Sequence, residues 1–377
     1  ASLTSSSNRC LLIATGTRLL CGERGQGCSV GRRGRRLPGF RSSVLEGVRR
    51  VVEPDWVVRW RGSAGAVLAE QVTQRLRDGA ALDDLPLGRV DGRIDLRGFS
   101  TELPKIAGQV EVREDLGDGG PQPVDGIVLV EDHLELDGVT LRGLDLRHAR
   151  LSSLRLVDVS IENCRLDEAV CWDWRAWGLT VMDTTFCNAD LRDSALGIWS
   201  DGKFSSFQSV DFSGADLRSL RFTRSAFARC AFDGSRLDGG EFTDCAFSEC
   251  AFAGAFSDMI FRGGQLDRVS FAGAQMRYVG FYGVGLAGVE LPADREAHVV
   301  VRRYPCVVRR ALERLAGEPP GSSSSTLRAR LQADLAKLDD SRDIGLWHRD
   351  ELGRTGAEQE AARALLESVE RECLVGA

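Results

Sequence analysis

The sequence predicts a solenoid built from a tandem five-residue repeat. A hydrophobic residue recurs at every fifth position from about Leu136 to Leu291, a spacing that neither the period of a helix nor the alternation of a strand produces. Of the 16 Phe residues in the chain, 13 fall on this one phase. Two residues before each marked position the side chain is usually small or β-branched, as in Ala189, Ala215 and Cys230. Each unit is therefore expected to direct two side chains into a shared core.

These units resemble the pentapeptide-repeat family, whose consensus is Ala-(Asp/Asn)-Leu followed by two variable residues. The consensus stands almost intact at residues 189–193 and 215–219. The resemblance implies a right-handed quadrilateral β-helix, in which four units make one square coil and residues twenty apart stack. We expect about eight coils over residues 131–292, with strands about 4.8 Å apart.

The sequence agrees with that geometry, because residues twenty apart are alike. Phe222 should stack on Phe242. The same ladder should continue into Phe261 and Phe281, although the unit between 252 and 256 is one residue short. We therefore expect one continuous solenoid, whose two ends need covers because an open coil exposes unpaired backbone groups.

Composition narrows the class of protein. The chain has 377 residues, a net charge of −6 and no run of about 18 apolar residues, so we expect no transmembrane helix and a cytoplasmic location. Eleven Cys occur, but those in the repeats fall mostly on inward positions and are interpreted as core thiols. With four His and no Cys-x-x-Cys motif, neither a metal site nor a cofactor is predicted.

The N-terminal flank divides into two parts. Residues 1–45 are acid-poor, with four Arg at 32–36, and are predicted to be a disordered or leader-like basic tail; contact with nucleic acid is the alternative. Residues 46–130 are predicted to be a cap and a run-in to the first coil, with a separate small domain as the alternative. This cap should contain a helix between about Val51 and Arg77, followed by short β-like runs at 109–112 and 127–130.

Residues 293–377 are predicted to form a C-terminal helical extension. The five-residue period stops after Leu291, and a strand-to-helix passage ending near Gly317 follows. Two further amphipathic segments run from about 326 to 338 and from 356 to 373. Their apolar stripes fit three roles: covering the solenoid, binding a partner, or joining two chains into a homodimer.

Two places interrupt the repeat and define a candidate partner-binding site. At residues 171–177, Trp174 takes an inward position that is otherwise small, which predicts a bulge. The second place is the long interval between Leu196 and Phe207. The candidate residues are Trp172, Arg175, Trp177, Trp199, Asp201 and Lys203. Exposed aromatic side chains beside basic ones are typical of binding hot spots; the alternative is that the tryptophans pack onto the repeats and fill the bulge.

The sequence therefore predicts a non-enzymatic scaffold that binds another protein. The alternative, implied by the family resemblance, is a DNA mimic that binds DNA gyrase or another type II topoisomerase and modulates fluoroquinolone sensitivity. Mimicry requires dense negative charge along the repeats. Between Leu136 and Leu291 there are 21 acidic and 16 basic residues, which gives that alternative weak support. No direct contact between the repeats and nucleic acid is expected.

Overall fold

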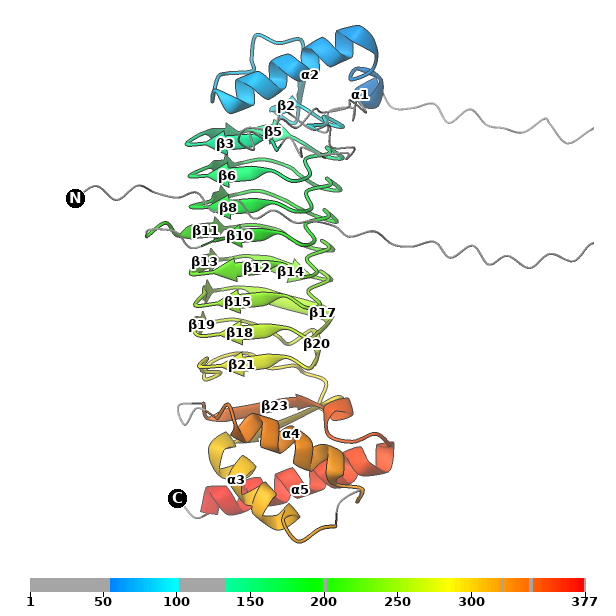
Figure 1. The fold of residues 1–377 in the computed structure, drawn as a ribbon, viewed down its shortest axis with the longest axis vertical. Coiled ribbons are helices and arrows are strands. Elements are labelled where there is room, and N and C mark those ends of the chain that lie inside the picture. Colours follow the sequence, from blue (N-terminus) through cyan, green and yellow to red (C-terminus); the bar gives the residue numbers. More distant parts are fainter. Residues whose placement is uncertain (1–54, 102–132, 199–201, 320–321, 339–341, 376–377) are drawn as a thin grey trace, which may run out of the picture. The chain divides into compact units, whose positions relative to one another are not determined.

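The protein forms a parallel β-helix with helices at both ends (Figure 1). The structure, a computed structural model, describes residues 55–101, 133–198, 202–319, 322–338 and 342–375. The predicted basic tail and the β-like runs at 109–112 and 127–130 lie outside these residues. All described residues belong to one compact unit.

Two long sheets form the first and second faces of the β-helix. Eight strands on the first face mark about seven turns from β3 to β21, which confirms the predicted solenoid. The first face contains β3 (Glu135–Asp137), β6 (Arg155–Val157), β8 (Arg175–Trp177), β10 (Ala195–Gly197), β12 (Arg221–Thr223), β15 (Glu241–Thr243), β18 (Ile260–Arg262) and β21 (Gly280–Tyr282), stacked in that order. The second face contains β4 (Thr140–Arg142), β7 (Ser160–Glu162), β9 (Thr180–Met182), β11 (Ser205–Gln208), β13 (Ser225–Ala228), β16 (Ala246–Ser248) and β19 (Gln265–Asp267).

The third and fourth faces have less regular pairing. They are built from isolated bridges and from β5 (Leu144–Asp145), β14 (Ala231–Asp233), β17 (Ala251–Ser257) and β20 (Ala274–Arg277). Strand neighbours on all four faces run parallel, as successive coils of one chain must. Each coil thus presents four short sides to solvent.

The corners between faces depend on residues in the left-handed backbone region. Such residues recur every five positions, for example Asp158 (φ 51°), Asn163 (φ 50°) and Asp173 (φ 60°). Positive φ is costly for most side chains, and Gly, Asn and Asp tolerate it best. Gly254 lies in the shortened unit with φ 103°, and a Cβ there would come within 3.1 Å of the Gly234 Cα. Glycine at this corner therefore lets the coil close with one residue fewer.

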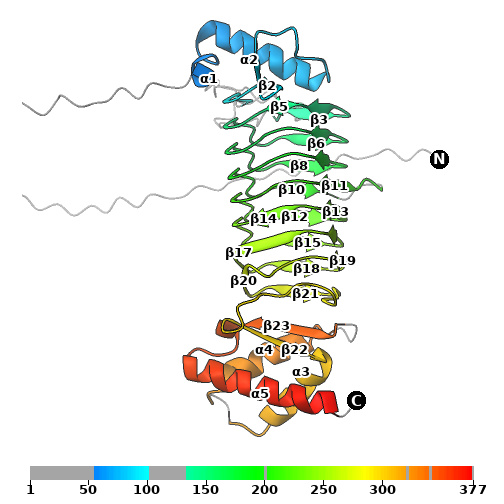
Figure 2. The same ribbon diagram turned by 180° about the vertical axis from the view of Figure 1, so that it is seen from behind.

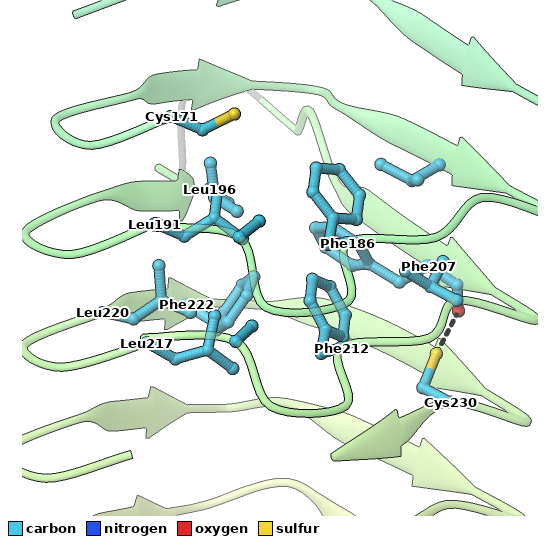
Figure 3. Packing of buried hydrophobic residues seen from close by; sticks show 14 of the residues in the cluster. Cys171, Phe186, Leu191, Leu196, Phe207, Phe212, Leu217, Leu220, Phe222 and Cys230 are labelled. Atoms are coloured by element: carbon cyan, nitrogen blue, oxygen red, sulfur yellow. Dashed lines mark hydrogen bonds between the residues drawn. The ribbon is translucent and has the colours of Figure 1, made fainter. Parts of the chain in front are cut away.

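Inward side chains of successive coils stack in ladders (Figure 3). Ring centroids are 5.2 Å apart between Phe222 and Phe242, 5.3 Å between Phe242 and Phe261, and 5.1 Å between Phe261 and Phe281. All three pairs are nearly parallel, with interplanar angles of 6°, 13° and 8°. The predicted ladder is confirmed, including its passage across the shortened unit. Stacked aromatic pairs contribute about 0.5–1.5 kcal/mol beyond their buried area.

The N-terminal end of the β-helix is covered by a helix. The predicted helix is present but interrupted at residues 59–61, giving α1 (Asp55–Val58) and α2 (Gly62–Arg77). Buried Val72 and Leu76 join α2 to the core of the first coils. The chain then forms β1 (Arg89–Val90) and β2 (Arg93–Asp95), and β2 runs parallel to β5. β5, the first strand of the third face, therefore has a hydrogen-bonded partner in the cap.

Asp95 connects this cap to the first coil. Its carboxylate is 9% exposed and accepts hydrogen bonds from Arg59 and, at 2.9 Å, from the Arg97 Nε. Arg59 also donates to the backbone carbonyl oxygens of Leu87 and Asp95, both at 2.9 Å. A carboxylate buried with such donors stays charged and fixes the position of α1.

The C-terminal end is covered by a small α/β layer (Figure 2). It contains β22 (His298–Arg302), α3 (Tyr304–Leu315), α4 (Ser325–Leu335), β23 (Ile344–His348), the short 3₁₀ helix η1 (Arg349–Glu351) and α5 (Gly356–Val375). The three predicted helices are present, whereas β23, which pairs antiparallel with β22, was not predicted. The sequence pattern of α5 predicts an apolar stripe through Ala361, Leu365, Val369 and Cys373. In the structure the buried residues of α5 are Ala362, Leu366, Val369 and Cys373, so the stripe is displaced by one residue at two positions.

Side chains of this layer bind backbone groups of the last coil. The backbone N–H of Met276 donates to the His298 Nε2 (3.1 Å), and that of Tyr278 donates to the Glu351 Oε1 (2.8 Å). The buried Arg342 guanidinium donates to the carbonyl oxygen of Phe281 (3.0 Å). Buried backbone groups at a sheet edge are costly unless paired, so these contacts close the β-helix.

A disulfide between Cys306 and Cys373 joins α3 to α5. In the repeats, the thiols of Cys164, Cys171 and Cys245 are free and buried, as predicted. Disulfides persist mainly in oxidising compartments, so the cytoplasmic location stays a prediction. Among the described residues, no helix is both long and apolar enough to span a bilayer.

Acid should weaken the N-terminal cap through Asp95. Burial raises the pKa of this carboxyl, but hydrogen bonds from Arg97 and Arg59 outweigh burial and lower it from 3.8 to about 2. The ionised Asp95 carboxylate therefore stabilises the folded protein fully above about pH 4, and this stabilisation is lost as the pH falls from about 4 to 2. We expect Asp95→Asn to lose about 2 kcal/mol at pH 7 and to show less loss on acidification than the wild type.

Urea denaturation at pH 7 and pH 3 measures both effects. Asp84→Asn is the control, because the Asp84–Arg75 pair is solvent-exposed and exposed pairs contribute little. Equal acid sensitivity of Asp95→Asn and the wild type would contradict the assignment.

Candidate functional site

The candidate site surrounds an insertion between β10 and β11. Val181 pairs with Phe207, an offset of 26 residues where neighbouring coils have 20. Six residues are therefore added to this coil, and the register shifts next to Gly197. Two of the predicted site residues, Trp199 and Asp201, lie in this insertion and outside the described residues.

The described end of the insertion is held at the corner between the first and second faces. The Lys203 Nζ lies 2.6 Å from the Asp158 Oδ2. Gly178 is the corner residue beside this pair, and a Cβ there would come within 2.4 Å of the Asp158 Oδ1. The backbone N–H of Leu179 donates to the Ser205 Oγ at 3.1 Å, which fixes the start of β11. This corner is thus anchored by an ion pair, and Gly178 leaves room for the Asp158 carboxylate.

Phe204 is the aromatic residue that the sequence-based site omitted. Its side chain is 63% exposed, more than Tyr278 (45%) or Trp172 (42%). A signal was present in the sequence, because Phe204 is one of only three Phe residues outside the five-residue phase. Of the other two, Phe99 is fully buried in the N-terminal cap, and Phe40 lies outside the described residues.

Arg175 and Trp177 lie on the outer side of β8. They flank the inward Ala176, and both are half-buried. The Arg175 guanidinium lies 2.6 Å from the Asp173 Oδ1 and donates to the carbonyl oxygen of Asp193 at 2.7 Å. Trp177 immediately precedes the Gly178 corner, so it lies beside the anchored end of the insertion.

The structure does not gather all the predicted residues at one point. Arg175 and Trp177 lie on β8, and Lys203, from the next coil, packs beside the Gly178 corner that follows this strand. Trp172 lies in the turn before β8, at the other end of that strand. We call Trp177, Lys203 and Phe204 the insertion corner.

The predicted bulge at Trp174 is wrong. Leu156 pairs with Ala176, so β6 and β8 keep the regular offset. The Trp174 ring is 2% exposed, and its Nε1 donates to the carbonyl oxygen of Leu151 at 2.5 Å. Two small buried residues accompany the ring: Ala176 occupies the other inward position of the same unit, and Ser194, one coil later, accepts a hydrogen bond from the Trp174 backbone N–H at 3.0 Å. The large and small positions have exchanged within this unit, so no backbone change is needed.

Acidic side chains on the fourth face are paired with arginine. The Asp216 carboxylate accepts from the Arg218 Nη2 at 2.7 Å and lies 3.6 Å from Arg236 and 3.8 Å from Arg192. Burial raises the pKa of Asp216, but the hydrogen bonds from Arg218 outweigh it and lower the pKa. This face therefore presents alternating charges and not a continuous negative stripe.

The described residues offer little to a metal ion. They contain no cluster of three or more His, Cys, Asp or Glu side chains arranged to hold one. Burial raises the pKa of the Cys164 thiol to about 11 and that of Cys245 to about 12, so both are protonated at neutral pH. Such thiols are poor ligands and poor nucleophiles.

Comparison with known proteins agrees with the fold. A family model described as pentapeptide repeats matches residues 205–244 with eight copies. A comparison with curated proteins finds no match. Residues 205–244 therefore consist of pentapeptide repeats, and they lie within a parallel β-helix made of five-residue units.

Two solved structures illustrate the likeness. HetL, a pentapeptide-repeat protein involved in heterocyst differentiation regulation from the cyanobacterium Nostoc sp. strain PCC 7120, is 18% identical, with a TM-score of 0.23; the match covers 42% of this chain and 78% of HetL. A trypsin-treated variant of QnrB1, a plasmid-mediated fluoroquinolone resistance protein, is 17% identical, with a TM-score of 0.30; the match covers 42% of this chain and 80% of that one.

Replacing Trp174 should destabilise the β-helix. We expect Trp174→Ala to cost about 3–5 kcal/mol, because it leaves a cavity beside the small Ala176 and Ser194. The double variant Trp174→Leu with Ala176→Leu reproduces the Leu154 and Leu156 pair of the preceding coil and should recover most of the loss. Urea denaturation followed by circular dichroism measures all three proteins.

Trp172→Ala is the matched control, since an exposed tryptophan two residues away should change stability by no more than about 0.5 kcal/mol. A larger loss for Trp172→Ala than for Trp174→Ala would refute the exchange of large and small positions.

Proposed function

We propose that this protein is a non-enzymatic scaffold that binds another protein through the insertion corner. The observation that carries the proposal is the 63% exposure of Phe204, in a chain whose other described Phe residues are buried. Exposing an aromatic ring forgoes the stabilisation of its burial. A ring in that position is therefore available to a partner.

The chemistry of the corner supports this proposal. Binding hot spots are enriched in aromatic and Arg side chains at positions that are rigid before binding. Trp177 lies on a strand, and the Lys203–Asp158 pair holds the chain next to Phe204. Arg175, fixed by Asp173, adds a charged group on the same strand. The proposed surface thus combines aromatic side chains with charged groups held by ion pairs.

Topoisomerase binding by DNA mimicry is the less favoured function. A protein surface that binds DNA is built to neutralise phosphates. On the fourth face, Asp216 is already neutralised by Arg218, with Arg192 and Arg236 nearby. This pairing of charges favours a partner recognised by its shape and apolar contacts.

The homodimer through the C-terminal helices is a separate proposal. The stripe of α5 that includes Val369 packs inside its own chain, which leaves less apolar surface for a second copy. Light scattering on the full chain decides it: a mass of two chains supports the homodimer, and a mass of one chain rejects it.

Substitution at the corner tests the proposed function. Quantitative co-purification should find a protein whose recovery falls at least tenfold with Phe204→Ala and with Trp177→Ala. Tyr278→Ala is the matched control, because Tyr278 is also an exposed aromatic corner residue but lies outside the insertion. The proposal fails if recovery of every partner is unchanged by Phe204→Ala or falls equally with Tyr278→Ala.

A gyrase supercoiling assay with the same three variants tests whether the partner is a topoisomerase. Inhibition or fluoroquinolone protection that Phe204→Ala abolishes would make a topoisomerase the partner of this corner. Absence of any effect would reject topoisomerase binding and leave the co-purified protein as the partner.

A further inference from the structure

Two free thiols lie on adjacent coils inside the third face. Cys230 directly precedes β14, and Cys250 directly precedes β17. These strands pair in parallel with Ala231 opposite Ala251, and the backbone N–H of Ala251 donates to the carbonyl oxygen of Cys230 at 3.1 Å. The two cysteines therefore occupy the same inward position one strand spacing apart, about 4.8 Å. Both are buried, with 2% and 1% exposure.

Cys230 and Cys250 are the one pair of described free thiols that occupy equivalent positions in neighbouring coils. Among the described free thiols, the other four have no cysteine at the equivalent position of a neighbouring coil: Cys164, Cys171, Cys187 and Cys245. A disulfide needs Cα atoms about 4.4–6.8 Å apart. The strand spacing places Cys230 and Cys250 inside that range.

The two thiols influence each other's ionisation. The Cys230 Sγ lies 3.4 Å from the carbonyl oxygen of Phe207 (Figure 3), and the Cys250 Sγ lies 3.4 Å from the carbonyl oxygen of Ser248. Hydrogen bonding from Cys230 lowers the pKa of Cys250 and raises that of Cys230. Cys250 is thus the sulfur that ionises more readily, and its neighbour is positioned to react next.

We propose that Cys230 and Cys250 form a redox site that a hydroperoxide converts into a disulfide between adjacent coils. The Cys250 thiolate attacks one peroxide oxygen; an S–O bond forms, the O–O bond breaks, and the released oxygen leaves as water or an alcohol. The Cys230 sulfur then attacks the Cys250 sulfur, the S–S bond forms, and the S–O bond breaks to give water. The two thiols lose two electrons and two protons, and the peroxide is reduced.

The product would connect successive coils of the β-helix. In the reduced protein these coils are held by backbone hydrogen bonds and by stacked side chains, such as Phe232 on Phe252 with centroids 4.5 Å apart. A disulfide between adjacent coils closes a loop of about one coil and restricts the unfolded chain. Oxidation is therefore expected to raise the melting temperature of the β-helix without changing its fold.

Peptide mapping of the full chain tests the proposal. Trypsin cleaves after Arg229, Arg236 and Arg262, which places Cys230 on one peptide and Cys250, together with Cys245, on another. After treatment with hydrogen peroxide and alkylation of remaining thiols, the non-reduced digest should contain these peptides linked, two hydrogens lighter than their sum. The link should persist in Cys245→Ser and be lost in Cys230→Val and Cys250→Val.

Valine suits these variants, because Val210 and Val269 occupy the same inward position in the coils on either side. Peroxide should raise the melting temperature of the wild type and leave that of Cys230→Val unchanged. The proposal is overturned if the link runs through Cys245. It is also overturned if both cysteines stay alkylatable at a peroxide dose that links the same peptides in the denatured chain.

Discussion

The stacking of inward side chains, one coil above the next, is the interaction on which the rest of the structure depends. Most strands of this β-helix contain only three residues, too few to be stable alone. Each coil gains its stability from its neighbours, as in other solenoids. A Phe such as Phe242, held between Phe222 and Phe261, contributes about 1.5–3 kcal/mol through burial. The five-residue period of hydrophobic residues in the sequence follows from this need for each inward side chain to stack on its neighbours.

Stacking constrains the combined volume of the inward side chains but does not fix which residue occupies each position. It also requires both ends of the β-helix to be covered. Trp174 and Ala176 exchange their sizes within one unit without disturbing the pairing of β6 with β8. At the ends, where no further coil is present, other groups replace the missing neighbour. Val72 of α2 packs at the first coil, and His298 and Glu351 accept the backbone N–H groups of the last one. Where six residues are inserted, the chain leaves this pattern, and Phe204 is the most exposed Phe among the described residues.

Local patterns predicted much of the fold, because the period and the helical stripes can be read within a few residues. The ladder through Phe261 and the helices α3 to α5 were found in this way. The bulge at Trp174 was mispredicted, because one inward position was considered without its small partner Ala176. The contact of Lys203 with Asp158 depends on residues 45 apart, and β23 depends on pairing with the distant β22. No local pattern reports such contacts, so the site was predicted only in part: the interval was found, but its exposed Phe204 was not.

Deletion of one complete coil tests the central claim most directly. Removing residues 222–241 joins Arg221 to Phe242 and leaves every remaining inward side chain in phase, because Phe222 and Phe242 are equivalent. Removing residues 222–239 deletes less of the chain but shifts all later positions by two. Thermal unfolding followed by circular dichroism should show the full-coil deletion melting cooperatively, within a few degrees of the wild type, and the shorter deletion melting far lower. Equal stability of the two deletions would contradict the account.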